Sequence, residues 1–96
     1  MVVGVAQFEL FMPYNQSLKE KRHLLGKLKD RVLAQLKVVV SEVGHQDLWQ
    51  RAQLGFAVVG SDEKVLDALI GKTMRAIVAM GLGEVLREER DFLHYE

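Results

Sequence analysis

The sequence predicts an α+β fold with the element order β-α-β-β-α-β. Three observations predict it: four short segments have the alternating or β-branched composition of strands, two segments repeat apolar residues at helical spacing, and both of these begin with a capping signal. In this order four antiparallel strands form one sheet, with the first and third strands central and both helices on one face. We therefore expect a ferredoxin-like fold, formed as one domain by residues 1–96, because 96 residues are enough for one small core.

The first strand and the first helix are predicted from local patterns. Apolar and polar side chains alternate from Val2 to Met12, which predicts a strand with one buried face. Ser17 and Glu20 then form a capping box, in which each side chain accepts a backbone N–H of the first helical turn. The helix is expected to end near Leu36. Its apolar stripe consists of Leu18, Leu25, Leu28, Val32 and Leu36.

The next two strands are predicted to form a hairpin. β-branched residues indicate a short strand from Lys37 to Val43, and alternation indicates a longer one from Ala52 to Val59. The connection runs from His45 to Gln50, where Gly44 is expected to supply a positive φ and Asp47 to cap a single helical turn. The buried face of the longer strand carries Leu54, Phe56 and Val58.

The second helix and an edge strand complete the predicted fold. Gly60-Ser61 is expected to start the helix, with Ser61 as a cap and Asp62 and Glu63 in the first turn, where the helix dipole favours acids. Gly81 to Gly83 ends it, and the charged segment from Val85 to Tyr95 is predicted to be an edge strand. The buried stripe of this helix consists of Leu66, Leu69, Ile70, Thr73, Ile77 and Met80.

One sheet face lacks a helix in this fold. It is either solvated or covered by a second copy of the chain, and two copies can enclose a small molecule between them. The residues predicted to line it are Val3, Val5, Gln7, Glu9, Gln53, Gly55 and Ala57. Met74 and Val78, beside Gly71, lie off the predicted stripe of the second helix. They are either exposed apolar side chains or part of a self-association surface.

Composition excludes several classes of site. The 13 basic and 13 acidic residues balance, which argues against strong non-specific nucleic-acid binding but leaves a local basic patch open. Without cysteine there is no disulfide, thiolate metal site or cysteine nucleophile. The N-terminus lacks the pattern of a signal peptide and no segment has the length of a membrane helix, so a cytoplasmic protein is expected. No phosphate-binding or catalytic motif is present, so we predict no cofactor and no enzyme.

The hairpin connection is the first candidate site. It carries His45, Asp47, Trp49 and Arg51. Either Trp49 folds back onto the sheet and the segment is a well-specified turn, or these side chains contact a partner, since Trp and Arg dominate binding surfaces. His45 and Asp47 are too few to hold a metal, and they are the one pair that resembles an acid–base pair.

The start of the first helix is the second candidate site, with Lys19, Lys21 and Arg22. Between Ser17 and Lys37 there are seven basic and two acidic residues, whereas the last 13 residues carry five acids and two arginines. At 100° per residue Lys21 falls among the apolar stripe, so it must extend outward or pair with an acid. The segment is therefore either a solvated helix face or a patch that binds phosphate or RNA.

Three motifs resemble the YlxP-like family of small bacterial proteins. They are Ser17 to Arg22, Val40 to Val43, and the stretch Asp47 to Gly55, which reads DLWQRAQLG. The resemblance covers nearly the whole chain and implies a ferredoxin-like fold of unknown function, with no catalytic residues to carry over. Genes of that family often lie beside those of a translation initiation factor and a ribosome-binding factor, which implies a role near translation.

Two functional hypotheses follow. In the first, the chain is a non-enzymatic accessory protein that binds RNA, the ribosome or a translation factor through Lys19, Lys21 and Arg22 and through the hairpin connection. In the second, it is a homodimeric regulatory module whose open face encloses a small molecule, with Gln7, Glu9, Gln53, Gly55 and Ala57 as the lining.

Overall fold

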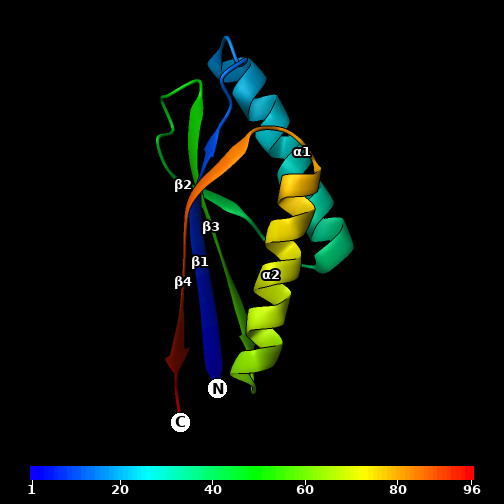
Figure 1. Cartoon of the computed structure of the whole chain (residues 1–96), viewed down its shortest axis with the longest axis vertical. Helices are drawn as coiled ribbons and strands as arrows, with labels where there is room; N and C mark the ends of the chain where they lie inside the picture. Colours follow the sequence, from blue (N-terminus) through cyan, green and yellow to red (C-terminus); the bar gives the residue numbers. More distant parts are fainter.

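The computed structural model describes all 96 residues and confirms the ferredoxin-like α+β fold. The four strands form one antiparallel sheet in the order β2-β3-β1-β4, so β1 and β3 are central as predicted. Both helices lie on one face of the sheet and leave the other, the bare face, without a helix (Figure 1). The elements are β1 (Val2–Phe11), α1 (Leu18–Leu36), β2 (Ser41–Gly44), β3 (Arg51–Gly60), α2 (Glu63–Ala79) and β4 (Glu84–His94).

The hydrophobic core fills the space between the sheet and the two helices. Alternation along the central strands directs one set of side chains toward the helices, and Phe8, Leu10 and Leu54 are almost fully buried there. The predicted stripe of α1 is confirmed in its middle, whereas Leu18 and Leu36 at the helix ends are only half-buried. The core thus holds the sheet and helices together from one side only.

The second strand is shorter than predicted. Lys37 has a left-handed backbone (φ 58°) and ends α1, with its N–H donated to the carbonyl of Leu33. The chain then crosses from the helix layer to the sheet edge, so residues 38–40 have no strand to pair with before Ser41. Val38 and Val40 are nevertheless buried in the core, which explains their β-branched, strand-like composition.

The second helix differs from the prediction at both its cap and its surface. Asp62 is the N-cap, because its Oδ1 accepts the N–H of Lys64 at 2.9 Å, so Ser61 is not the cap. Met74 is buried in the core, so it is neither an exposed apolar side chain nor part of a self-association surface, whereas Val78 is exposed. Leu69 and Met80 of the predicted stripe are partly buried against the core.

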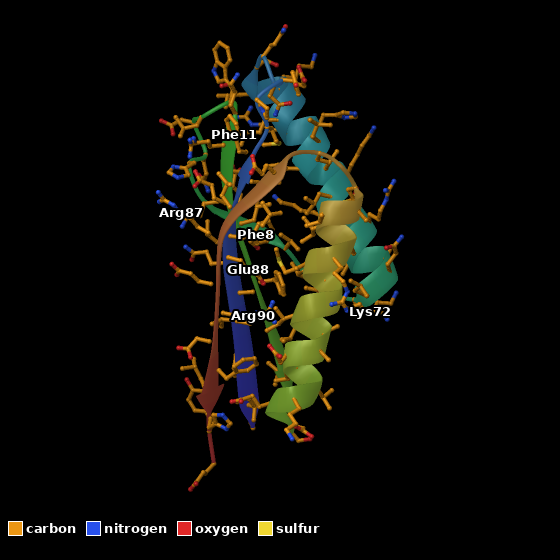
Figure 2. The ribbon with its side chains drawn as sticks, in the orientation of Figure 1. Phe8, Phe11, Lys72, Arg87, Glu88 and Arg90 are labelled. Carbon is orange, nitrogen blue, oxygen red and sulfur yellow. The ribbon has the colours of Figure 1, made fainter.

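The edge strand β4 contains a β-bulge that the sequence does not reveal. Gln7 pairs with Glu89, and Glu9 pairs with Leu86. Arg87 and Glu88 therefore both lie opposite the single residue Phe8 of β1. Arg87 adopts a left-handed backbone (φ 52°). Arg87 lies on the side of the strand away from the helices, whereas Glu88 and Arg90 lie on the helix side (Figure 2). Arg87 of the bulge therefore lies on the bare face.

Candidate functional site

A buried lysine fixes the hairpin connection to the first helix. Lys21 is 1 % exposed, and its Nζ forms an ion pair with Oε2 of Glu42 at 2.8 Å. The same ammonium donates to the carbonyls of His45 at 2.6 Å and Leu48 at 2.7 Å. A buried ammonium is stable only with such partners. Lys21 is thus inaccessible to a phosphate, and its prediction as an RNA contact is corrected to a structural role.

Two loops are joined into one end of the molecule, which we call the tip (residues 12–17 and 45–50). The N–H of Met12 donates to the carbonyl of Gln50 at 2.7 Å. The side chain of Asn15 donates to the carbonyl of Trp49 at 3.2 Å, and that of Gln50 donates to the carbonyls of Pro13 and Asn15. These bonds tie segments more than 30 residues apart, so the conformation of the tip is determined jointly by both loops.

The tip presents aromatic side chains to solvent. Trp49 is 53 % exposed and Tyr14 is 89 % exposed, so Trp49 does not fold back onto the sheet as the turn interpretation expected. Asp47 makes no side-chain hydrogen bond and caps no helical turn. Instead the N–H of Leu48 donates to the carbonyl of His45 at 3.1 Å. The positive φ of the turn belongs to His45 (56°) and not to Gly44.

A carboxylate is buried at the centre of the polar half of the bare face. Glu9 is 7 % exposed, and its Oε1 accepts from Nη1 of Arg51 at 2.8 Å. Nε2 of His45 lies 3.6 Å from the same oxygen, and the guanidinium of Arg51 also lies over the ring of Phe11 at 5.3 Å. The hydrogen bond from Arg51 lowers the pKa of Glu9 below 4.5 against the opposing effect of burial, and the charges of Arg51, His45 and Arg87 lower it further.

This carboxylate forms part of the wall of a small recess of about 140 Å³ on the bare face. The predicted residues Gln7, Glu9 and Gln53 lie around it together with His45 from the tip. Its lining is completed by Phe8, Arg87 and Glu89. Sequence reasoning missed Arg87 and Glu89. Alternation puts both on one side of β4, but both sides of this strand carry charged residues, so the sequence does not show which side faces away from the helices. The His45–Asp47 pair of the acid–base hypothesis is replaced by a His45–Glu9 contact.

The other residues predicted for the bare face share it with the recess. Gly55 lies opposite Gln7, and Ala57 lies opposite Val5, in the register of β1 and β3. Gly44 matters here for space, since a Cβ on it would collide with the amide of Gln53. The glycine therefore lets the Gln53 side chain lie at the edge of the recess.

The outer surface of α1 is rich in cations that have no ion-pair partner. Lys19 and Arg22 of the predicted basic patch are exposed, and neither forms a salt bridge. The further basic residues of this surface are Lys27, Lys29, Arg31 and Lys37. Neither helix of the fold is both long and apolar enough to cross a membrane.

Residues 3–90 match the family described as Protein of unknown function (DUF503). The chain belongs to this family. It is also 42 % identical over 60 residues to the uncharacterised protein YlxP of Bacillus subtilis (strain 168). That match covers 62 % of this chain and 65 % of the relative, so the aligned part spans somewhat less than two thirds of the relative's length. The predicted family resemblance is confirmed, and the DUF503 family brings no established activity with it.

A solved structure resembles the chain only loosely. SnoaB, a cofactor-independent oxygenase from Streptomyces nogalater, crystallised as a mutant, aligns with 98 % of this chain and 91 % of its own at 11 % identity. The TM-score is 0.42, which is too low to support an argument about activity.

Proposed function

We propose that this DUF503 protein is a non-enzymatic accessory protein that binds RNA, in the setting of the ribosome or translation, through the tip and the start of α1. The observation that carries the proposal is that exposed aromatic and exposed basic side chains lie at the same end of the molecule. Trp49 and Tyr14 are exposed in the tip, and α1, whose first turns carry Lys19 and Arg22, begins directly after tip residue Ser17. Proteins bind single-stranded nucleic acid by combining cations for the phosphates with aromatic faces for the bases.

The distribution of charge supports this orientation. With Lys21 buried, six basic residues remain between Ser17 and Lys37 against two acids. The strand β4, at the opposite edge of the sheet from β2, carries in contrast four acids and two arginines. An anionic polymer would therefore be attracted to the α1 side and repelled by β4, although the net charge is zero.

A groove beside Tyr14 offers a place for an unstacked base. It has a volume of about 460 Å³, and its lining includes Phe11, Leu24 and Leu82 with the carboxylates of Glu20 and Glu84. Carboxylates accept hydrogen bonds from the exocyclic amines of bases, and the apolar side chains pack against their faces. One wall is rigid backbone, since a Cβ on Gly83 would collide with the carbonyl of Phe11.

The proposal is tested by capture of partners from a bacterial lysate with and without nuclease. The immobilised chain should retain RNA, and a Tyr14→Ala/Trp49→Ala variant should lose it, since each stacked base contributes about 1–3 kcal/mol. Tyr95→Ala is the matched control, because Tyr95 is also exposed but lies at the end of β4 away from the tip. The chain could instead retain a protein that nuclease treatment does not release. That result would contradict an RNA partner and indicate a protein partner, such as a translation factor.

A second candidate function is that of a homodimeric regulatory module, in which two copies pair through the bare face and enclose a small molecule. The observation that favours it is the apolar half of that face near the chain termini, where Val3 lies between Val59 and Leu93. Val59 is 63 % exposed and Leu93 43 % exposed. Sedimentation should then detect a dimer that Val59→Glu dissociates, whereas a monomer at micromolar concentration would contradict this function.

A further inference from the structure

We propose that the recess on the bare face binds a small zwitterion of the free α-amino acid class, with its carboxylate on Arg87 and its ammonium group on Glu89. The recess is separate from the tip aromatics and from the cations of α1, so this inference does not depend on RNA binding. It concerns the six polar residues Gln7, Glu9, His45, Gln53, Arg87 and Glu89, which line the recess together with Phe8.

The first support is the set of groups left without a partner. Glu9 is already paired with Arg51 and contacts His45. Arg87 and Glu89, in contrast, take part in no salt bridge, with each other or with any other residue. The amides of Gln7 and Gln53 also make no side-chain hydrogen bond within the chain. The recess therefore offers one free cation, one free anion and two free amides.

The charge balance decides the kind of ligand. A simple anion would pair with Arg87 but be repelled by Glu89. A simple cation would pair with Glu89 but be repelled by Arg87. A molecule with both charges satisfies both groups, and the amides can donate to its carboxylate or accept from its ammonium. Neutral sugars or alcohols would leave both charges without a counter-charge.

The size of the recess limits the ligand further. At about 140 Å³ the recess is similar in volume to a cavity of roughly 150 Å³ that holds one benzene molecule. That space takes glycine, alanine or serine, and it is too small for a nucleotide or a peptide. The ligand class is therefore the smallest amino acids.

The second support is the backbone strain at the recess. Three residues other than glycine have a positive φ, and two of them, His45 and Arg87, line this recess. A left-handed backbone at such residues costs about 1–2 kcal/mol relative to glycine. Strain of this kind is typically retained where the side chain has a task. Glycine would fit the bulge of β4 better, and it would remove the only free cation of the recess.

The experiment is a titration of the isotope-labelled full chain with glycine and alanine, followed by amide NMR. Saturable shifts are expected at His45, Gln53 and the β4 bulge, with a Kd on the order of 1 mM for so small a ligand. Acetate and methylamine, which each carry half of the ligand's charges, should bind at least tenfold more weakly. Arg87→Gly and Glu89→Gln should each weaken glycine binding at least tenfold.

Arg87→Gly has a matched control in Lys37→Gly. Both replace a strained residue by glycine, but Lys37 lies at the end of α1 and does not line the recess. Both variants should remain folded, and only Arg87→Gly should lose binding. The proposal would be overturned by the absence of saturable shifts with either amino acid. It would equally be overturned if acetate bound as tightly as glycine and Glu89→Gln had no effect.

Discussion

At the scale of single residues, the same helix start holds two lysines with opposite roles. Helical spacing alone places Lys21 among apolar positions and Lys19 outside them, so the contrast is visible in the sequence. The partners of Lys21 are not visible, because Glu42, His45 and Leu48 lie more than 20 residues away in the chain. The position of the Trp49 backbone was unpredictable for the same reason, since its carbonyl accepts a hydrogen bond from the distant Asn15 side chain.

Lys21→Ala should destabilise the protein strongly. The substitution leaves Glu42 and two loop carbonyls without their buried partner, and breaking such a pair costs about 3–5 kcal/mol. Lys19→Ala, at an exposed position two residues earlier, should change the free energy of unfolding by less than about 0.5 kcal/mol. Urea unfolding measures both values. Equal stability of the two variants would contradict the structural role of Lys21.

The Glu9 carboxylate should make stability depend on pH in the acid range. Its pKa is lowered in the folded state by Arg51, so its contribution is present above the ordinary pKa near 4.5 and is lost as pH falls through the folded value. Glu9→Gln removes this titration. The free energy of unfolding of the original chain should therefore fall more steeply with acid than that of the variant. Parallel pH profiles below 4.5 would exclude the contribution.

At the scale of elements, the sequence predicted the features that short stretches of the chain determine by themselves, such as a helix cap and the buried face of a strand. The predicted N-cap at Ser17 is confirmed, because Ser17 Oγ accepts the N–H of Glu20 at 3.0 Å, whereas the return bond from Ser17 N–H to the Glu20 side chain is not formed. The alternation of β1 and β3 defines the buried face. The bulge of β4 and the short β2 were missed because both are decided by strand pairing. A one-residue shift between β1 and β4 leaves the composition of either strand unchanged.

Glycine should stabilise the two elements that end or bend at strained residues. Lys37→Gly at the end of α1 and Arg87→Gly in the β4 bulge each relieve a positive φ, which offsets the greater flexibility of glycine in the unfolded chain. The expected gain is about 0.5–1 kcal/mol for each variant. Thermal unfolding measures it, with Leu33→Gly inside α1 as a contrasting variant that should lose stability. A loss in either strained variant would show that its side chain stabilises the fold.

At the scale of the whole molecule, charge and topology act together. The fold joins two loops into the tip and places the start of α1 beside it (Figure 1). The strand order puts the acidic β4 on the opposite edge of the sheet from β2. The fold class follows from the order of elements, so sequence alone predicted it. The tip and the recess each combine residues from distant segments, so the sequence named His45 and Trp49 but missed Tyr14, Arg87 and Glu89.

The most direct test of the central claim is a titration of labelled single-stranded RNA at several salt concentrations. Three proteins are compared: the original chain, Lys19→Glu/Arg22→Glu at the tip end, and Lys64→Glu/Lys72→Glu, which makes the same charge change on exposed positions of α2. RNA binding predicts that the first pair weakens affinity about tenfold or more and reduces the salt slope by roughly one to two, while the α2 pair changes both much less. Equal losses from the two pairs, or no binding by the original chain, would contradict the claim.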